Sequence, residues 1–168
     1  MKDGPDELCA INVDGTDLSS LTKSRYIVDV KWSPDGGRLA FSDDSGWYVL
    51  ELGSLTVVDI TPKGFQDWNA DWSPDSQQIV VARRGVVGEE FTPTNLCVVA
   101  LNDLGVKWLT AFPDSELGSD DPAWSPDGRW IAFSSPTGLY VVDVEEGSVR
   151  QVTHTESTWE RYPLWAPR

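Results

Sequence analysis

The strongest constraint on the fold is a short motif that recurs along the chain. A tryptophan is followed by Ser-Pro-Asp in three copies and by Ala-Pro in the last. The copies begin at Trp32, Trp72, Trp124 and Trp165, so they are separated by 40, 52 and 41 residues. Self-similarity at this period indicates repeated supersecondary units that bury their apolar faces on one another. Such repeats build a scaffold, so activity is expected in loops carried on it or in parts of a longer protein.

Each repeat contains four strand-like segments. In the first repeat they are residues 27–32, residues 38–42 after a Pro-Asp-Gly turn, residues 47–52, and a last segment that ends at Ile60-Thr61. Short β-branched runs between Gly, Pro and Asp are typical of strands and hairpins. No segment has an amphipathic helix pattern. The pattern predicts an all-β chain of four-stranded antiparallel blades, the architecture of a β-propeller.

The repeat also predicts how the chain is divided. We expect a single propeller segment with three complete blades and a partial blade at each end. An open array leaves strand edges uncovered, which favours a segment of a longer propeller; the alternative is a homodimer that completes the ring. The expected parts are an outer half-blade at 1–24, a blade at 25–64, a blade with long loops at 65–117, a blade at 118–157, and the first strand of a further blade at 158–168.

These motifs resemble a known repeat. The W-S-P-D-G turn, the strand Ile131–Ser134, the Tyr-Val-Val-Asp strand at 140–143 and the Leu109-Thr110 pair resemble the blades of TolB-like, WD-repeat-like propellers. The same repeat occurs in the propellers of prolyl-oligopeptidase-type serine peptidases. The first resemblance implies a non-catalytic scaffold for protein–protein interaction in the periplasm or cell envelope. The second implies the propeller of a larger serine hydrolase, which gates or positions substrate. A sensory propeller joined to a kinase or regulator is a third alternative.

The charge balance restricts the partners. The chain has 27 Asp and Glu residues against 13 Lys and Arg, a net charge of −14. This acidity disfavours nucleic acid and anionic membrane surfaces, which need clustered cations. No apolar run approaches the ~20 residues that cross a bilayer, and residues 1–6 lack the apolar core of a signal peptide. We therefore expect no nucleic-acid partner, no membrane insertion and no export signal in this chain. The acidity is compatible with a basic protein partner, and a solvated acidic surface is the favoured explanation.

Strand alternation assigns the loops to two faces. The long segments 83–94 and 111–121 fall on the same face, and long loops on a rigid scaffold often carry binding residues. Aromatic side chains flanked by charges suit a protein-binding patch. For the tryptophans among them, packing against neighbouring blades is an equal alternative. The candidate binding residues are Phe65, Asp67, Trp68, Arg84, Glu89, Phe91, Phe112, Trp159, Arg161 and Tyr162.

Two further sets occupy equivalent positions in the repeat. The motif tryptophans Trp32, Trp72, Trp124 and Trp165 are expected to be structural and to fill the wedge between adjacent blades. Three positions earlier stand Asp29, Asn69, Asp121 and Tyr162, which we expect to line the mouth of a central channel. Carboxylates converging there suit Ca²⁺. Because the repeat sets their spacing, a hydrated polar channel is favoured, and no metal or cofactor is expected.

A catalytic constellation is not evident in the sequence. His154 is the only histidine, and there is no G-x-S-x-G elbow, phosphate loop or dinucleotide fingerprint. We therefore expect no catalytic residues in this chain; a G-x-S-x-G segment elsewhere in a parent protein would favour the hydrolase alternative. Cys9 and Cys97 fall at the same strand position two repeats apart. They are expected to be buried free thiols, too distant for a disulfide.

Overall fold

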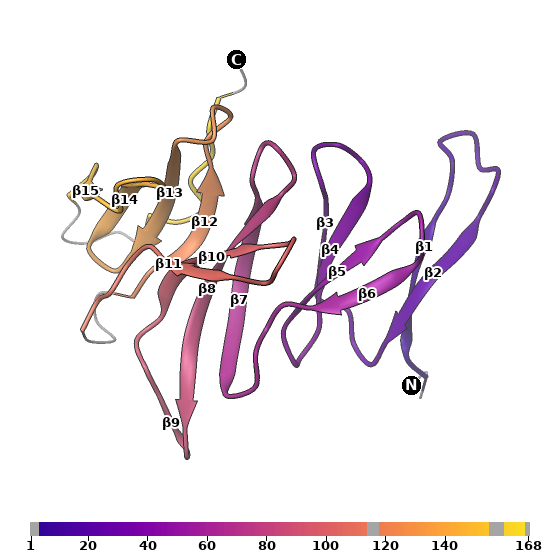
Figure 1. Cartoon of the computed structure of the whole chain (residues 1–168), viewed down its shortest axis with the longest axis horizontal. Coiled ribbons are helices and arrows are strands. Elements are labelled where there is room, and N and C mark those ends of the chain that lie inside the picture. Colours follow the sequence, from indigo (N-terminus) through magenta and orange to yellow (C-terminus); the bar gives the residue numbers. More distant parts are fainter. Residues whose placement is uncertain (1–3, 114–117, 155–159, 167–168) are drawn as a thin grey trace. The chain divides into compact units, whose positions relative to one another are not determined.

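The computed structural model describes residues 4–113, 118–154 and 160–166, and within these ranges the chain is all-β (Figure 1). Its strands form four antiparallel sheets of two to five strands, which confirms the expected fold class at this level. The chain divides into two compact units between Thr61 and Pro62. The described part contains no helix that is long and apolar enough to cross a membrane.

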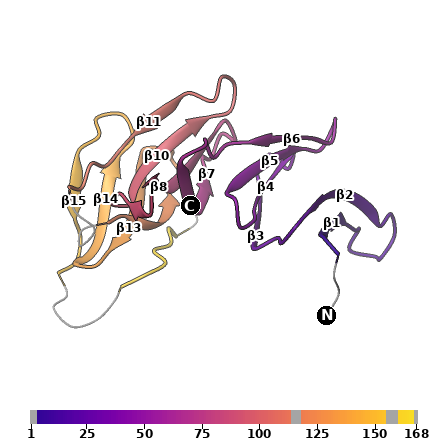
Figure 2. The same ribbon diagram turned by 90° about the horizontal axis from the view of Figure 1, so that it is seen from below.

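The first unit contains a two-stranded and a four-stranded sheet. In the four-stranded sheet the strands lie in chain order, and β5 and β6 run side by side in both views (Figures 1 and 2). Leu39, Phe41 and Leu50 form its buried core, on which Leu8 and Leu21 of the two-stranded sheet pack. The strands are β1 (Asp6–Ala10), β2 (Ser19–Ser24), β3 (Asp29–Trp32), β4 (Arg38–Ser42), β5 (Trp47–Glu51) and β6 (Thr56–Asp59).

The second unit contains the other two sheets. One has the order β11-β10-β8-β7, with β9 paired to β8, and the other has the order β12-β13-β14-β15. Both sheets contribute to one apolar core, which includes Val80 and Leu96 from the first and Trp124, Ile131 and Phe133 from the second. The strands are β7 (Phe65–Trp72), β8 (Gln78–Val87), β9 (Glu90–Phe91), β10 (Asn95–Ala100), β11 (Val106–Trp108), β12 (Asp120–Trp124), β13 (Trp130–Ser135), β14 (Gly138–Asp143) and β15 (Val149–Gln151).

The Ser-Pro-Asp turns close the hairpins β3–β4, β7–β8 and β12–β13 in the same way. The buried Ser73 hydroxyl donates a 2.6 Å hydrogen bond to Asp75, and Asp75 accepts another from the amide of Gln77 at 3.0 Å. The turns at Ser33 and Ser125 repeat the hydroxyl–carboxylate bond at 2.6 Å. In each turn the motif aspartate also accepts from the backbone amide two residues later, so it caps the turn.

The Thr of each aliphatic-Thr pair has an equally regular position. Its hydroxyl accepts a hydrogen bond from a backbone amide at the start of the third strand of the repeat, which is β5, β10 or β14. The distance is 2.8–2.9 Å in the pairs Trp47–Thr61, Leu96–Thr110 and Leu139–Thr153. Gly138 precedes one of these amides with φ +131, and a Cβ there would lie 2.5 Å from the carbonyl oxygen of Thr153. This contact explains why a glycine stands there.

The Asp75 turn leads to a pH prediction. Its hydrogen bond from Ser73, and then that from the Gln77 amide, hold the pKa of the Asp75 carboxyl below its usual range. A lowered folded-state pKa stabilises the fold above the ordinary Asp value of about 3.9, and this contribution is lost as pH falls through the folded value. In wild type the free energy of unfolding, measured with urea, should fall as the pH is lowered from 5. We expect this fall to be smaller in Asp75→Asn, because the variant has no carboxyl to protonate at this position. Glu89→Gln, at an exposed position, is the charge control. Equal losses in wild type and Asp75→Asn would contradict the argument.

Two sequence predictions differ from the structure. The segment 83–94 was expected to be a long loop, but β8 continues to Val87 and pairs with β9 through Val86–Phe91 and Val87–Glu90. β-Branched residues before Gly88, which has φ +66, allow this hairpin extension. Cys9 was expected to be buried but is exposed, because it lies in the two-stranded sheet, whereas Cys97 is buried.

Candidate functional site

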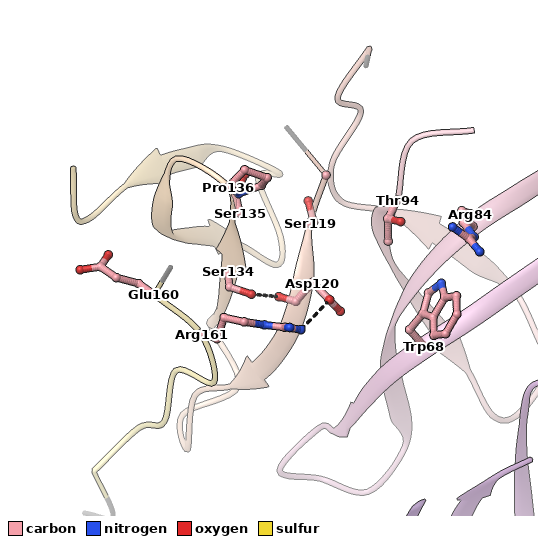
Figure 3. A pocket seen from close by; sticks show the side chains of 11 residues that line it. Trp68, Arg84, Thr94, Ser119, Asp120, Ser134, Ser135, Pro136, Glu160 and Arg161 are labelled. Atoms are coloured by element: carbon pink, nitrogen blue, oxygen red, sulfur yellow. Dashed lines mark hydrogen bonds and ion pairs between the residues drawn. The ribbon is translucent and has the colours of Figure 1, made fainter. Parts of the chain in front are cut away.

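A pocket of about 340 Å³ lies in the second unit (Figure 3). Residues of β7, β8, β12 and β13 and of the segment 160–166 line it. We call it the Trp68 pocket. Its volume falls within the range of small-ligand sites. It is lined by Trp68, Arg84, Thr94, Gly118, Ser119, Asp120, Ser134, Ser135, Pro136, Glu160 and Arg161.

Two β-bulges shape the pocket walls. The pairing of β7 with β8 shifts register between Asp67 and Ala70, and that of β12 with β13 shifts between Asp120 and Ala123. A bulge adds one residue to a strand and changes the direction of its side chains. Asp121 lies in the second bulge with φ +48. Trp68 lies in the first bulge and Asp120 borders the second, and both side chains line the pocket.

One wall of the pocket is aromatic and cationic. The Arg84 guanidinium carbon lies 3.6 Å from the centre of the Phe91 ring and 4.9 Å from that of Trp68. Arg84 also donates from Nε and Nη2 to the Gln66 side-chain oxygen, at 3.2 and 2.8 Å. Gln66 and Arg84 are direct cross-strand partners. The extension of β8 into β9 thus places Phe91 against the guanidinium.

The opposite wall is acidic and joins the two sheets of the unit. Asn69 donates to Oδ1 of Asp120 at 2.8 Å and to Oδ1 of Asp121 at 2.9 Å. Arg161 pairs with both carboxylates, at 3.0 Å to Asp120 and 2.8 Å to Asp121. The hydrogen bond to Asp121 is the main reason that the pKa of Arg161 is raised. Figure 3 shows this wall facing Trp68 and Arg84 across the pocket.

The structure brings part of the predicted binding set together. Trp68, Arg84 and Arg161 line the pocket, and Phe91 contacts Arg84. Phe65 contacts Arg83 and Trp108, Tyr162 lies against Arg161, and Glu89 is exposed in the β8–β9 turn. Asp67 and Phe112 lie elsewhere: Asp67 is buried in an ion pair with Arg83, and Phe112 packs on the core. Trp159 lies outside the described residues.

Two of the predicted channel residues, Asn69 and Asp121, belong to the second unit and are hydrogen-bonded to each other at 2.9 Å. Asp29 belongs to the first unit, where its carboxylate accepts from the Val30 amide at 2.8 Å. The oxygens of Asp121 already accept from Arg161, Asn69 and Ser134. Among the described residues, no group of three or more His, Cys, Asp or Glu is placed to hold a metal ion. The channel itself stays a prediction.

The motif tryptophans do not have equivalent environments. Trp72 and Trp124 are buried, Trp165 is 36% exposed and Trp32 is 56% exposed. The indole N–H of Trp165 donates to the Ala123 carbonyl at 2.9 Å, which attaches the segment 160–166 to β12. The burial of Trp72 and Trp124 agrees with a structural role, and the expectation that all four tryptophans fill equivalent wedges stays a prediction.

Sequence reasoning missed several pocket residues. Ser134 and Ser135 end β13, Thr94, Ser119 and Asp120 lie in the long segments 83–94 and 111–121, and Glu160 begins the segment 160–166. The strand alternation that assigned the long loops to one face also places the end of the second strand of each repeat on that face. In β13 this end is the pair Ser134-Ser135, so the sequence could have indicated these two pocket residues.

No protein-family model matches the chain. Among curated proteins, it is 32% identical over 144 residues to an uncharacterised protein of Agrobacterium fabrum, a match that covers 80% of this chain and 44% of the relative. It is 26% identical over 143 residues to the uncharacterised peptidase YuxL of Bacillus subtilis, covering 64% of this chain and 21% of that protein. The chain thus spans less than half the length of these two relatives.

Solved structures define the fold class. TolB from Acinetobacter baumannii superposes with a TM-score of 0.64 at 24% identity, covering 90% of this chain and 38% of TolB. Oligogalacturonate lyase from Vibrio parahaemolyticus superposes with a TM-score of 0.64 at 18% identity, covering 97% of this chain and 50% of the lyase. The chain therefore has the blade architecture of TolB-like β-propellers. At these identities the likeness shows the fold alone.

Proposed function

We propose that this chain is a polypeptide-binding part of a β-propeller, with the Trp68 pocket as its contact site. The observation that carries the proposal is the side chain of Trp68, which lines a pocket yet is 52% exposed. Tryptophan and arginine are the side chains most enriched at binding hot spots. A large aromatic surface left open to solvent beside a fixed guanidinium is well suited to contact a partner.

The polarity of the pocket supports a polypeptide as the occupant. Its lining offers hydroxyl groups from Thr94, Ser134 and Ser135, carboxylates on one wall and a guanidinium on the other. A polypeptide presents N–H donors and C=O acceptors along its length, so it can use both walls at once. Its apolar side chains can cover the Trp68 ring.

Trp68→Ala is the first test. We expect it to weaken binding of peptides selected from a random dodecapeptide library by about tenfold or more, since hot-spot truncations cost about 2 kcal/mol. The melting temperature should change little, because the Trp68 side chain is about half exposed and is not part of the apolar core. Trp108→Ala is the matched control: Trp108 is also about half exposed, on β11 and outside the pocket lining. Failure of the library to yield any binder, or equal binding to both variants, would count against the proposal.

A second candidate function is suggested by the 26% identity to the peptidase YuxL. In that case the pocket would hold a peptide substrate for a hydrolase domain elsewhere in the protein. Hydrolysis of the selected peptides by the complete gene product would favour this candidate. Binding without hydrolysis would favour the interaction scaffold.

A further inference from the structure

We propose that Arg84 binds a carboxylate group of the polypeptide in the Trp68 pocket. The inference rests on the proposed function and names the chemistry that the occupant must present. It depends on three features of Arg84: its fixed position, its available donors and its lack of a described acidic partner.

The guanidinium of Arg84 is held in place before any ligand arrives. The rings of Phe91 and Trp68 contact it at 3.6 and 4.9 Å. Gln66 fixes its rotation by accepting from Nε and Nη2. A planar group positioned in this way loses little conformational freedom on binding. It is therefore prepared to recognise a planar anion.

Arg84 also retains hydrogen-bonding capacity. Its hydrogen bonds to other described residues use Nε and Nη2, so both N–H groups of Nη1 are available with respect to these residues. A carboxylate can accept from Nη1 together with the second N–H of Nη2, which gives a two-pronged, charge-assisted pair.

The charges in the pocket place the anion on this wall. Arg161 is paired with Asp120 and Asp121, whereas no described carboxylate lies within ion-pair distance of Arg84. Glu160 accepts a hydrogen bond from the Thr153 hydroxyl. An incoming carboxylate is therefore attracted to Arg84 and repelled from the opposite wall, where N–H donors of the same ligand are favoured. The acidic wall also disfavours a doubly charged phosphate.

The test compares two peptide libraries that differ only in carboxylates. One is a random dodecapeptide library, and in the other Asp and Glu are replaced by Asn and Gln and the C-terminus is amidated. We expect peptides from the first library, which contain carboxylates, to bind wild type at least about tenfold more tightly than peptides from the second. Their affinity should fall as the salt concentration rises. Arg84→Gln should abolish this preference. Arg84→Lys, which keeps the charge without the planar fork, should retain only part of it.

Arg150→Gln is the matched control, because Arg150 is exposed on β15 and outside the pocket. This variant should keep the full preference. If both libraries bind wild type equally and binding still needs Trp68, the carboxylate inference is overturned while the proposed function stands. If neither library binds, the proposed function fails as well. If the protein binds trigalacturonate but no peptide, the carboxylate that Arg84 recognises belongs to a sugar. That result would overturn the inference that the ligand is a polypeptide.

Discussion

Trp124→Ala is expected to lower the free energy of unfolding by about 3–5 kcal/mol, the range for removing a large aromatic side chain from a core. Trp124 is 7% exposed and belongs to the apolar core shared by both sheets of the second unit. Its indole N–H also donates to the Gly128 carbonyl at 3.1 Å. The variant therefore loses both packing and a hydrogen bond. Urea unfolding followed by circular dichroism measures the effect.

The control for Trp124 is the equivalent residue Trp32. Because that side chain is 56% exposed, Trp32→Ala should cost about 1 kcal/mol or less. Similar large losses in the two variants would show that Trp32 is buried in solution. A loss below about 1 kcal/mol for Trp124→Ala would contradict the shared core.

Asp67→Asn should be similarly destabilising, by about 3–5 kcal/mol, because it leaves a buried charge without its partner. Asp67 and Arg83 form a two-pronged ion pair with distances of 2.7 and 2.6 Å. Their side chains are 0% and 1% exposed. The variant keeps the buried guanidinium of Arg83 but removes the negative charge that compensates it.

The double variant Asp67→Leu with Arg83→Met separates charge burial from shape. Replacing a whole buried ion pair with apolar groups of similar volume is often neutral or stabilising. We expect the double variant to be within about 2 kcal/mol of wild type and clearly more stable than Asp67→Asn. If the double variant were the less stable of the two, the pair would contribute more than charge compensation.

The strands were predictable where the repeat specifies them locally. Residues 38–42 were expected as a strand and are β4, because a turn precedes the short apolar run Leu39–Phe41 and a polar residue follows it. The extension of β8 to Val87 was not predicted, because its pairing partner is the two-residue strand β9. A partner so short has no pattern of its own in the sequence.

The sequence predicted which face of the sheets carries the pocket, but it did not predict which side chains contact one another there. Strand alternation placed Trp68, Arg84 and Arg161 together, and they line one pocket. Asp67 was assigned to the same surface as a charge that flanks the aromatic residues Phe65 and Trp68. Its burial depends on the register that sets it opposite Arg83, next to a bulge. A bulge shifts side chains by one position, and no residue type in this segment indicates where it occurs.

The Ser-Pro-Asp turns have a consequence for how such a chain can diversify. Each turn is closed by a hydroxyl–carboxylate bond between residues two apart, as in Ser73–Asp75 and Ser125–Asp127. A duplicated unit therefore carries its own closure and depends little on its neighbours there. At the other end of the strands, the spacing between Trp72 and Trp124 has grown to 52 residues. Gene duplication can thus preserve the fold through one end of each unit while insertions at the other end create new binding specificity.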